Sequence, residues 1–324
     1  MSRTAATPTT RSEEVRVPGL EGHNPIGFFA ALGLARIVAR SIPSTLRWDE
    51  GVVPTAVIGG ITSIDDLVDA VMTDHAHWGD AAVLNHESCD DIKLRPGDLR
   101  RYLEACEADG ERSRELAAAL VVQRVVDGKG ASKPTDFHFT AGQQRFLAMC
   151  RQIRDGVTAD DIRRAITGGW TYASKLPSLM WDIADDRIYA LSSVNPSSEK
   201  KLTEPGAEWL ALMGLTSLPV TIGPERTLTP GARGRWKGGT FHWPVWQPPL
   251  SPLAVRSLLA AVDPGDSSQL LTARGCLTLY QSEIRRADQG GYGTFGPPTV
   301  VWQAPVAAES RPDPFASPDE VSGR

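Results

Sequence analysis

The sequence lacks the cysteine patterns of a zinc ribbon or a disulfide scaffold. Four cysteines occur among 324 residues, and no two of them form a C-x-x-C pair. They are spread along the chain at Cys89, Cys106, Cys150 and Cys276. We therefore expect reduced thiols that are mostly buried.

Long hydrophobic runs are also missing. The longest apolar stretches, "AALGLARIVA" and "LAAALVV", are much shorter than the roughly 20 residues that cross a bilayer. No signal peptide precedes them. We therefore expect a cytoplasmic protein with no membrane partner.

The chain has no excess of positive charge. It contains 34 Lys and Arg against 39 Asp and Glu, a formal net charge of −5 at pH 7. With 41% hydrophobic and 23% charged residues, the composition is that of a globular protein. Any nucleic-acid surface must therefore be local.

Catalytic signatures are absent as well. The sequence has no G-x-S-x-G elbow, no Walker A loop and no set of kinase motifs. A literal G-x-G-x-x-G occurs at Gly291, Gly293 and Gly296, but a dinucleotide site needs a helix directly after it. Two prolines follow instead, and they do not open such a helix. We expect a non-catalytic protein without a cofactor.

Helical periodicity dominates the first half of the chain. A helix over residues 25–40 is predicted by the N-cap residue Asn24, the proline after it and an apolar stripe. Ser63 with Asp66 predicts the start of a second helix. Residues 75–96 have no clear period and are expected to form a long loop. Further helices are expected in "DLRRYLEACEA", in "SRELAAALVVQRVVDG" up to Gly128, from Thr140 to Gly156, and in "TADDIRRAITGG".

The second half is richer in Pro, Gly, Trp and short extended runs. Strands are expected in "DRIYALS", "SLPVTIG", "GRWKGGTFHWPVW" and "PTVVWQ", and helices in "GAEWLALMGL" and "LAVRSLLAAV". The predicted fold class is α+β, with a helix-rich N-terminal half and a C-terminal half of helices and a mixed, largely antiparallel sheet. We expect a disordered tail over 1–14, a helical subdomain over 15–128, an α+β subdomain over 129–303 and a second disordered tail over 304–324.

Two segments combine basic, aromatic and glycine residues. Arginine and lysine neutralise phosphates, aromatic rings stack on bases, and bare glycine backbone approaches phosphates closely. A solvated hairpin or loop with packed aromatics accounts for either segment equally well. The candidate nucleic-acid-binding residues are Arg233, Arg235 and Lys237 in the first segment, and Arg285, Arg286, Gly291, Tyr292, Gly293 and Phe295 in the second.

A cluster of potential metal ligands lies in the expected loop after residue 74. Its members are His75, His77, Asp80, His86, Cys89 and two further acidic residues. Their spacing matches neither a zinc finger nor H-E-x-x-H, and short polar loops collect such residues for solvation. We therefore expect no metal here.

Several segments, taken in order, resemble CRISPR-associated proteins of type I-G systems, formerly called I-U. The resemblance is to large-subunit-like proteins or extensions of the helicase-nuclease, and it covers most of the chain between residue 20 and about residue 302, without the tails. The segments are "LEGHNPIGFFAALGLARI", "LRWDEG", "DFHFTAGQQRFL", "WDIADDRIYALSSVNPSSEK" and "GAEWLALMGLTSLPV".

The resemblance implies a non-catalytic subunit of an antiviral effector complex. Such a subunit would contact guide RNA or target DNA or dock the helicase-nuclease, while base pairing supplies sequence specificity. Two alternatives remain open. One is a protein adaptor that uses Trp236, Trp243 and Trp246 as exposed anchors; the other is a metal-dependent enzyme that uses His75, His77, His86 and Asp80.

Overall fold

The computed structural model confirms an α+β protein with antiparallel sheets. It describes residues 13–87, 89–183, 202–224, 226–235, 238–286 and 292–305. Among these residues, no helix is long and apolar enough to cross a membrane.

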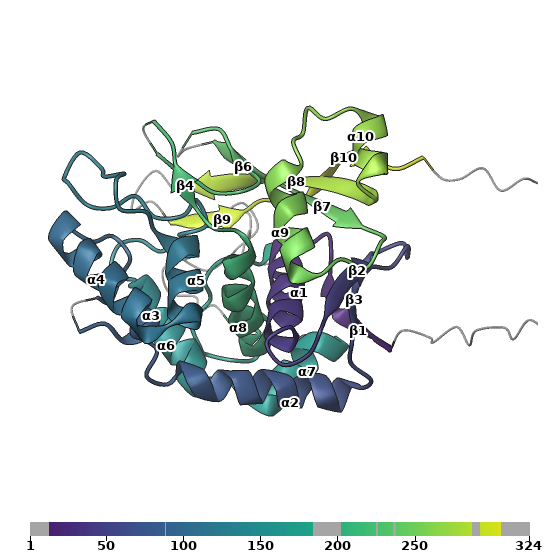
Figure 1. Ribbon diagram of the computed structural model, residues 1–324, viewed down its shortest axis with the longest axis horizontal. Helices are drawn as coiled ribbons and strands as arrows, with labels where there is room; N and C mark the ends of the chain where they lie inside the picture. Colours follow the sequence, from purple (N-terminus) through teal and green to yellow (C-terminus); the bar gives the residue numbers. More distant parts are fainter. Residues whose placement is uncertain are drawn as a thin grey trace, which may run out of the picture.

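The described helices are concentrated before the C-terminal sheet (Figure 1). They are α1 (Pro25–Val38), α2 (Ile64–His75), α3 (Ala82–Asn85), α4 (Pro96–Asp109), α5 (Glu111–Leu120), α6 (Phe146–Gly156), α7 (Ala159–Thr167), α8 (Pro205–Gly214), α9 (Pro252–Ala261) and α10 (Ser268–Ala273), with 3-10 turns η1 (Ala76–Trp78) and η3 (Leu215–Ser217).

The strands form three antiparallel sheets. A three-stranded sheet has the order β1-β3-β2, and a five-stranded sheet has the order β10-β8-β7-β6 with β9 also paired to β8. The third sheet is the pair β4-β5. The bounds are β1 (Glu14–Glu21), β2 (Thr45–Trp48), β3 (Thr55–Gly59), β4 (Thr221–Ile222), β5 (Thr227–Leu228), β6 (Ala232–Arg233), β7 (Gly239–Trp246), β8 (Cys276–Arg286), β9 (Gly293–Phe295) and β10 (Thr299–Gln303).

Local sequence signals set several helix ends as predicted. The Asn24 side chain accepts a hydrogen bond from the N–H of Ile26 at the start of α1. Ser63 accepts one from the N–H of Asp66 at the start of α2. Thr158 and Asp161 form a reciprocal capping box on α7, which ends where Gly168 takes a φ of 91°.

Two predicted helices are shorter than expected. The helix expected to reach Gly128 ends at Leu120, because Val121 has an extended backbone, and the chain turns back on itself further on, at residues 127–131. In that turn the Asp127 carboxylate accepts hydrogen bonds from the N–H groups of Lys129 (2.8 Å) and Ala131 (3.0 Å). This turn chemistry outweighs the helical preference of the preceding segment.

The helix expected from Thr140 begins only at Phe146. The Thr140 hydroxyl lies 2.9 Å from the His138 ring and caps no helix, and Gly142 has a φ of +60°, outside the helical region. The expected loop over 75–96 contains η1 and α3. The expected strand "DRIYALS" lies outside the described residues.

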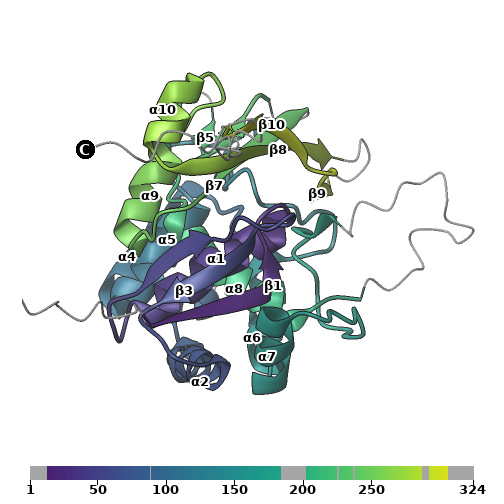
Figure 2. The same ribbon diagram turned by 90° about the vertical axis from the view of Figure 1, so that its right-hand side faces the viewer.

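The centre of the protein is the pair α1 and α8. In both views the C-terminal sheet lies on one side of this pair and α2 and α7 lie on the other (Figures 1 and 2). A Cβ atom at Gly33 would overlap the carbonyl oxygen of Leu210, and one at Gly214 would overlap that of Phe29. The two helices therefore touch through their backbones.

An aromatic cluster joins α1 to the C-terminal sheet. The ring of Phe28 lies 6.3 Å from Phe241 and 6.2 Å from Trp243, and that of Phe29 lies 5.3 Å from Phe241. One hydrophobic core thus includes elements from both sides of residue 129. The division into subdomains at that residue stays a prediction.

The helix crossing should tolerate no side chain at Gly33. We expect Gly33→Ala to lower the free energy of unfolding by about 3 kcal/mol, because the fixed backbone of α8 cannot move away without repacking the core. Urea unfolding measures this. The matched control is Gly97→Ala in α4, where a Cβ meets nothing within 4 Å and stability should stay unchanged or rise by up to about 1 kcal/mol. Equal effects of both substitutions would contradict a backbone contact.

Candidate nucleic-acid interface

The two basic segments meet on the outward face of the five-stranded sheet. Arg233 of β6 is opposite Thr240 of β7, and Thr240 is opposite Glu283 of β8. Directly opposed residues project from the same face, and Arg285 lies two residues beyond Glu283 on that face. In Figure 2 the sheet lies at the outside of the protein, above α1 and α8. Arg233 and Arg285 therefore share one surface.

Alternation along β8 produces this surface. Ser282 and Ile284 point into the core and are buried, whereas Glu283 and Arg285 are exposed. Strands with one face on a core and the other in water alternate in this way. The outward face is thus polar from Gln281 to the end of β8.

Each of these two arginines has a carboxylate partner. Nη2 of Arg233 lies 2.7 Å from Oδ2 of Asp263, and Nε of Arg285 lies 3.1 Å from Oε2 of Glu283. Hydrogen bonding by the Gly265 N–H, and then by Arg233, lowers the pKa of Asp263, so it stays ionised. Exposed ion pairs contribute little to stability, and a phosphate can take the place of either carboxylate.

His242 adds no charge to this face. Its Nε2 lies 2.7 Å from Oε1 of Gln281 on the neighbouring strand. Burial lowers its pKa, so the ring is neutral at pH 7. Arg235 is exposed and has no hydrogen bond or ion pair to another described residue. Lys237 and Gly291 lie outside the described residues.

Arg286 has a structural position and not the surface position that we expected. Its guanidinium donates to the carbonyl oxygens of Asp136 (2.7 Å) and His138 (3.0 Å) and lies 5.2 Å from the ring centre of Phe139. Burial lowers its pKa to about 10. Arg286 thus joins the end of β8 to the segment before α6, and its N–H groups are directed into the protein.

The expected stacking residue Phe295 is also internal. It is 0% exposed, and its ring lies 4.9 Å from Phe139 in an edge-to-face contact. Gly293 is buried in β9, where its N–H donates to the carbonyl oxygen of Phe139 (3.0 Å), and a Cβ would overlap the Phe139 ring. These two residues serve packing, and Tyr292, at 41% exposure, is the aromatic residue of this motif that reaches solvent.

The exposed tryptophans of the adaptor hypothesis are buried. Trp243 and Trp246 are 0% exposed, and their Nε1 atoms donate to the carbonyl oxygens of Gly22 (2.8 Å) and Leu46 (2.9 Å). They anchor the sheet to the N-terminal region and are not docking anchors. Trp236 lies outside the described residues.

The potential metal ligands lie in at least two separate environments. His75 Nε2 lies 2.8 Å from the carbonyl oxygen of Arg154, and His86 Nδ1 lies 3.5 Å from Cys89 Sγ. Within the described ranges, no group of three or more His, Cys, Asp or Glu side chains is placed to hold a metal. Asp80 and His86 line an open hollow of about 690 Å³ with Ala82, Asn85, Glu87 and Arg101.

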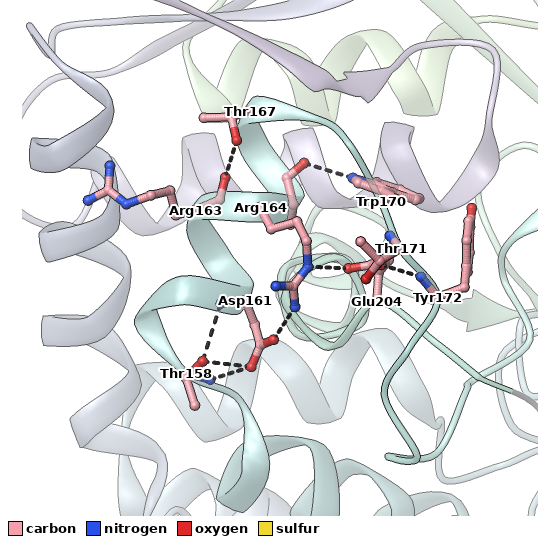
Figure 3. Close-up of polar contacts among 10 residues, drawn as sticks. Thr158, Asp161, Arg163, Arg164, Thr167, Trp170, Thr171, Tyr172 and Glu204 are labelled. Carbon is pink, nitrogen blue, oxygen red and sulfur yellow. Dashed lines mark hydrogen bonds and ion pairs between the residues drawn. The ribbon is translucent and has the colours of Figure 1, made fainter.

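Sequence reasoning missed several buried polar residues that support irregular segments. The Glu204 carboxylate, 2% exposed, accepts hydrogen bonds from Arg164 (3.0 Å) and from the N–H groups of Thr171 and Tyr172 (Figure 3). The only sequence signal was an acid directly before an apolar helix. These contacts hold the chain that follows α7.

A second buried polar group lies in the segment before α6. His138 is 1% exposed, and its Nε2 lies 2.9 Å from both Asp91 and the Thr140 hydroxyl. Burial lowers the pKa of His138, although Asp91 acts against this. Burial alone would raise the pKa of Asp91, but the hydrogen bond with His138 helps to keep it below its ordinary value.

These shifts predict a loss of stability in acid. The unfolded chain takes up a proton on His138 near its ordinary pKa of 6.5, whereas the folded protein resists it, so stability falls below about pH 6.5. We expect His138→Gln to weaken this fall between pH 7 and pH 5, by at most about 1.4 kcal/mol per pH unit. Urea unfolding at each pH gives the slope. The exposed His77→Gln is the control, and an unchanged slope in His138→Gln would contradict the prediction.

The sequence was compared with protein-family models and with curated proteins. It matches no family model and no curated protein.

Proposed function

We propose that the chain is a non-catalytic subunit of a cytoplasmic type I-G CRISPR effector complex that contacts the backbone of guide RNA or target DNA. The helicase-nuclease and the other effector subunits would be its protein partners. The observation that carries the proposal is the strand register, which puts Arg233 and Arg285 on one solvent-facing surface. The choice of a type I-G complex rests on the resemblance of the ordered sequence motifs to proteins of those systems.

A local cationic surface suffices for such a role in an acidic protein. Phosphate contacts give affinity without sequence information, and base pairing between guide and target supplies the specificity. Arg233 and Arg285 keep planar guanidinium groups at the surface, and Arg235 extends beyond β6. A guanidinium exchanges an exposed carboxylate for phosphate with the same bidentate geometry.

A protein adaptor is the second candidate, and the strand β10 favours it. β10 is at the edge of the sheet, and Val300 and Val301 are 54% and 44% exposed. Edge strands with exposed apolar residues pair with strands of other chains. Capture of effector subunits by this protein after nuclease treatment, and its loss in Val300→Lys, would favour the adaptor.

The nucleic-acid role predicts a salt-dependent interaction that depends on the sheet face. We expect the double substitution Arg233→Ala and Arg285→Ala to reduce the slope of log K against log salt by about 1–2, because phosphate contacts release counterions. The measurement is binding of guide RNA and of target duplex across a salt series, by the protein alone and in its complex.

The matched control is the double substitution Arg100→Ala and Arg101→Ala in α4. Both arginines are exposed and paired with a carboxylate, as Arg233 and Arg285 are. They lie on α4, at the opposite side of the protein from β9 in Figure 2. Undetectable binding in both settings, or equal losses in the two double variants, would contradict the proposal.

A further inference from the structure

The loop before α6 lies directly against β9. The Gly293 N–H donates to the carbonyl oxygen of Phe139, and Arg286 donates to that of His138. The start of this loop, His138 and Phe139, is therefore held against the strand that follows Tyr292. Two motifs that are far apart in the sequence, "FTAGQQR" and "YGTF", meet here at the surface.

Gly142 is the point where a cation and an aromatic ring come together. A Cβ atom at Gly142 would lie 2.5 Å from the Tyr292 hydroxyl oxygen, so the hydroxyl end of the Tyr292 side chain lies against the glycine. Nη1 of Arg145 donates hydrogen bonds to the carbonyl oxygens of Gly142 (3.1 Å) and Gln144 (3.3 Å). The positive φ of Gly142, +60°, gives the loop this shape.

Arg145 differs from the arginines of the sheet face in its partners. Arg233 and Arg285 each pair with a carboxylate, whereas the described residues offer Arg145 only backbone carbonyl oxygens. Gly142, Gln143 and Arg145 are exposed. The charge of Arg145 is therefore not neutralised by an ion pair within the described chain, and its other N–H groups are available to a phosphate.

Tyr292, whose hydroxyl end reaches the same glycine as Arg145, is 41% exposed. An aromatic side chain stacks on a base only when no neighbouring base covers that face, which is the case in a single strand and not inside a duplex. A cation for the phosphate and a ring for the base are the two elements with which single-strand-binding proteins hold a nucleotide.

We infer that Arg145 and Tyr292 bind one unpaired nucleotide, and that the nucleic acid on this surface is single-stranded. The inference rests on the proposed function and narrows its ligand to a single strand. Arg145 contacts the phosphate, Tyr292 stacks on the base, and Gly142 keeps the two side chains together. The bound nucleic-acid strand then continues towards Arg285. This arginine is close to Tyr292 because β9 pairs with the end of β8.

The test compares a fluorescent single strand with a duplex of the same sequence and length. We expect Tyr292→Leu to weaken single-strand binding about 5- to 100-fold and to leave duplex binding unchanged. Tyr292→Phe keeps the ring and should bind as the unmodified protein does. Arg145→Gln should lower the slope of log K against log salt for the single strand by about 1, and Arg100→Gln is its control.

The outcomes separate the inference from the proposed function. If the unmodified protein binds neither probe, alone or in its complex, the proposed function fails and the inference fails with it. If it binds a probe but Tyr292→Leu and Arg145→Gln bind as tightly as it does, only the inference is overturned. Equal losses for single strand and duplex in Tyr292→Leu would also overturn it. Urea unfolding of each variant shows whether the fold is kept.

Discussion

The backbone contact between α1 and α8 determines where the other elements lie. Gly33 and Gly214 leave no side chain between the two helices. The carbonyl oxygen of Leu210 on α8 therefore lies directly against Gly33, and that of Phe29 on α1 lies against Gly214. At this short separation Phe28 and Phe29 on α1 reach the aromatic residues of the C-terminal sheet. The inner face of that sheet is fixed by this packing, and its outer face is consequently left for solvent.

Buried polar side chains then hold the segments that have no regular structure. Arg286 donates hydrogen bonds to carbonyl oxygens of the segment before α6. Glu204 accepts hydrogen bonds from the N–H groups of the segment after α7. Backbone groups without a strand or helix partner must be satisfied in some other way when they are buried. These two charged residues do so, which explains why they are inside the protein.

Much of the fold could be predicted from local signals. The caps at Asn24, Ser63 and Thr158 and the α+β class are confirmed, because each depends on residues close in sequence. Contacts between distant segments could not be predicted in this way. Nothing around Arg286 or Phe295 in the sequence says that Phe139 is their neighbour, so both were expected at the surface. That Arg233 and Arg285 lie on one face of the sheet could likewise be known only from the strand register.

The hydrogen bond from Trp243 to the carbonyl oxygen of Gly22 joins residues 221 positions apart. The contact between α1 and α8 likewise joins segments that are far apart in the sequence, so α8 is synthesised long after α1. Contacts of such sequence separation form slowly, because a long intervening chain must first be ordered. Until α8 and the C-terminal sheet have been synthesised, the faces of α1 that pack against them have no cover. Apolar surface exposed in this way makes a partly folded chain prone to aggregation.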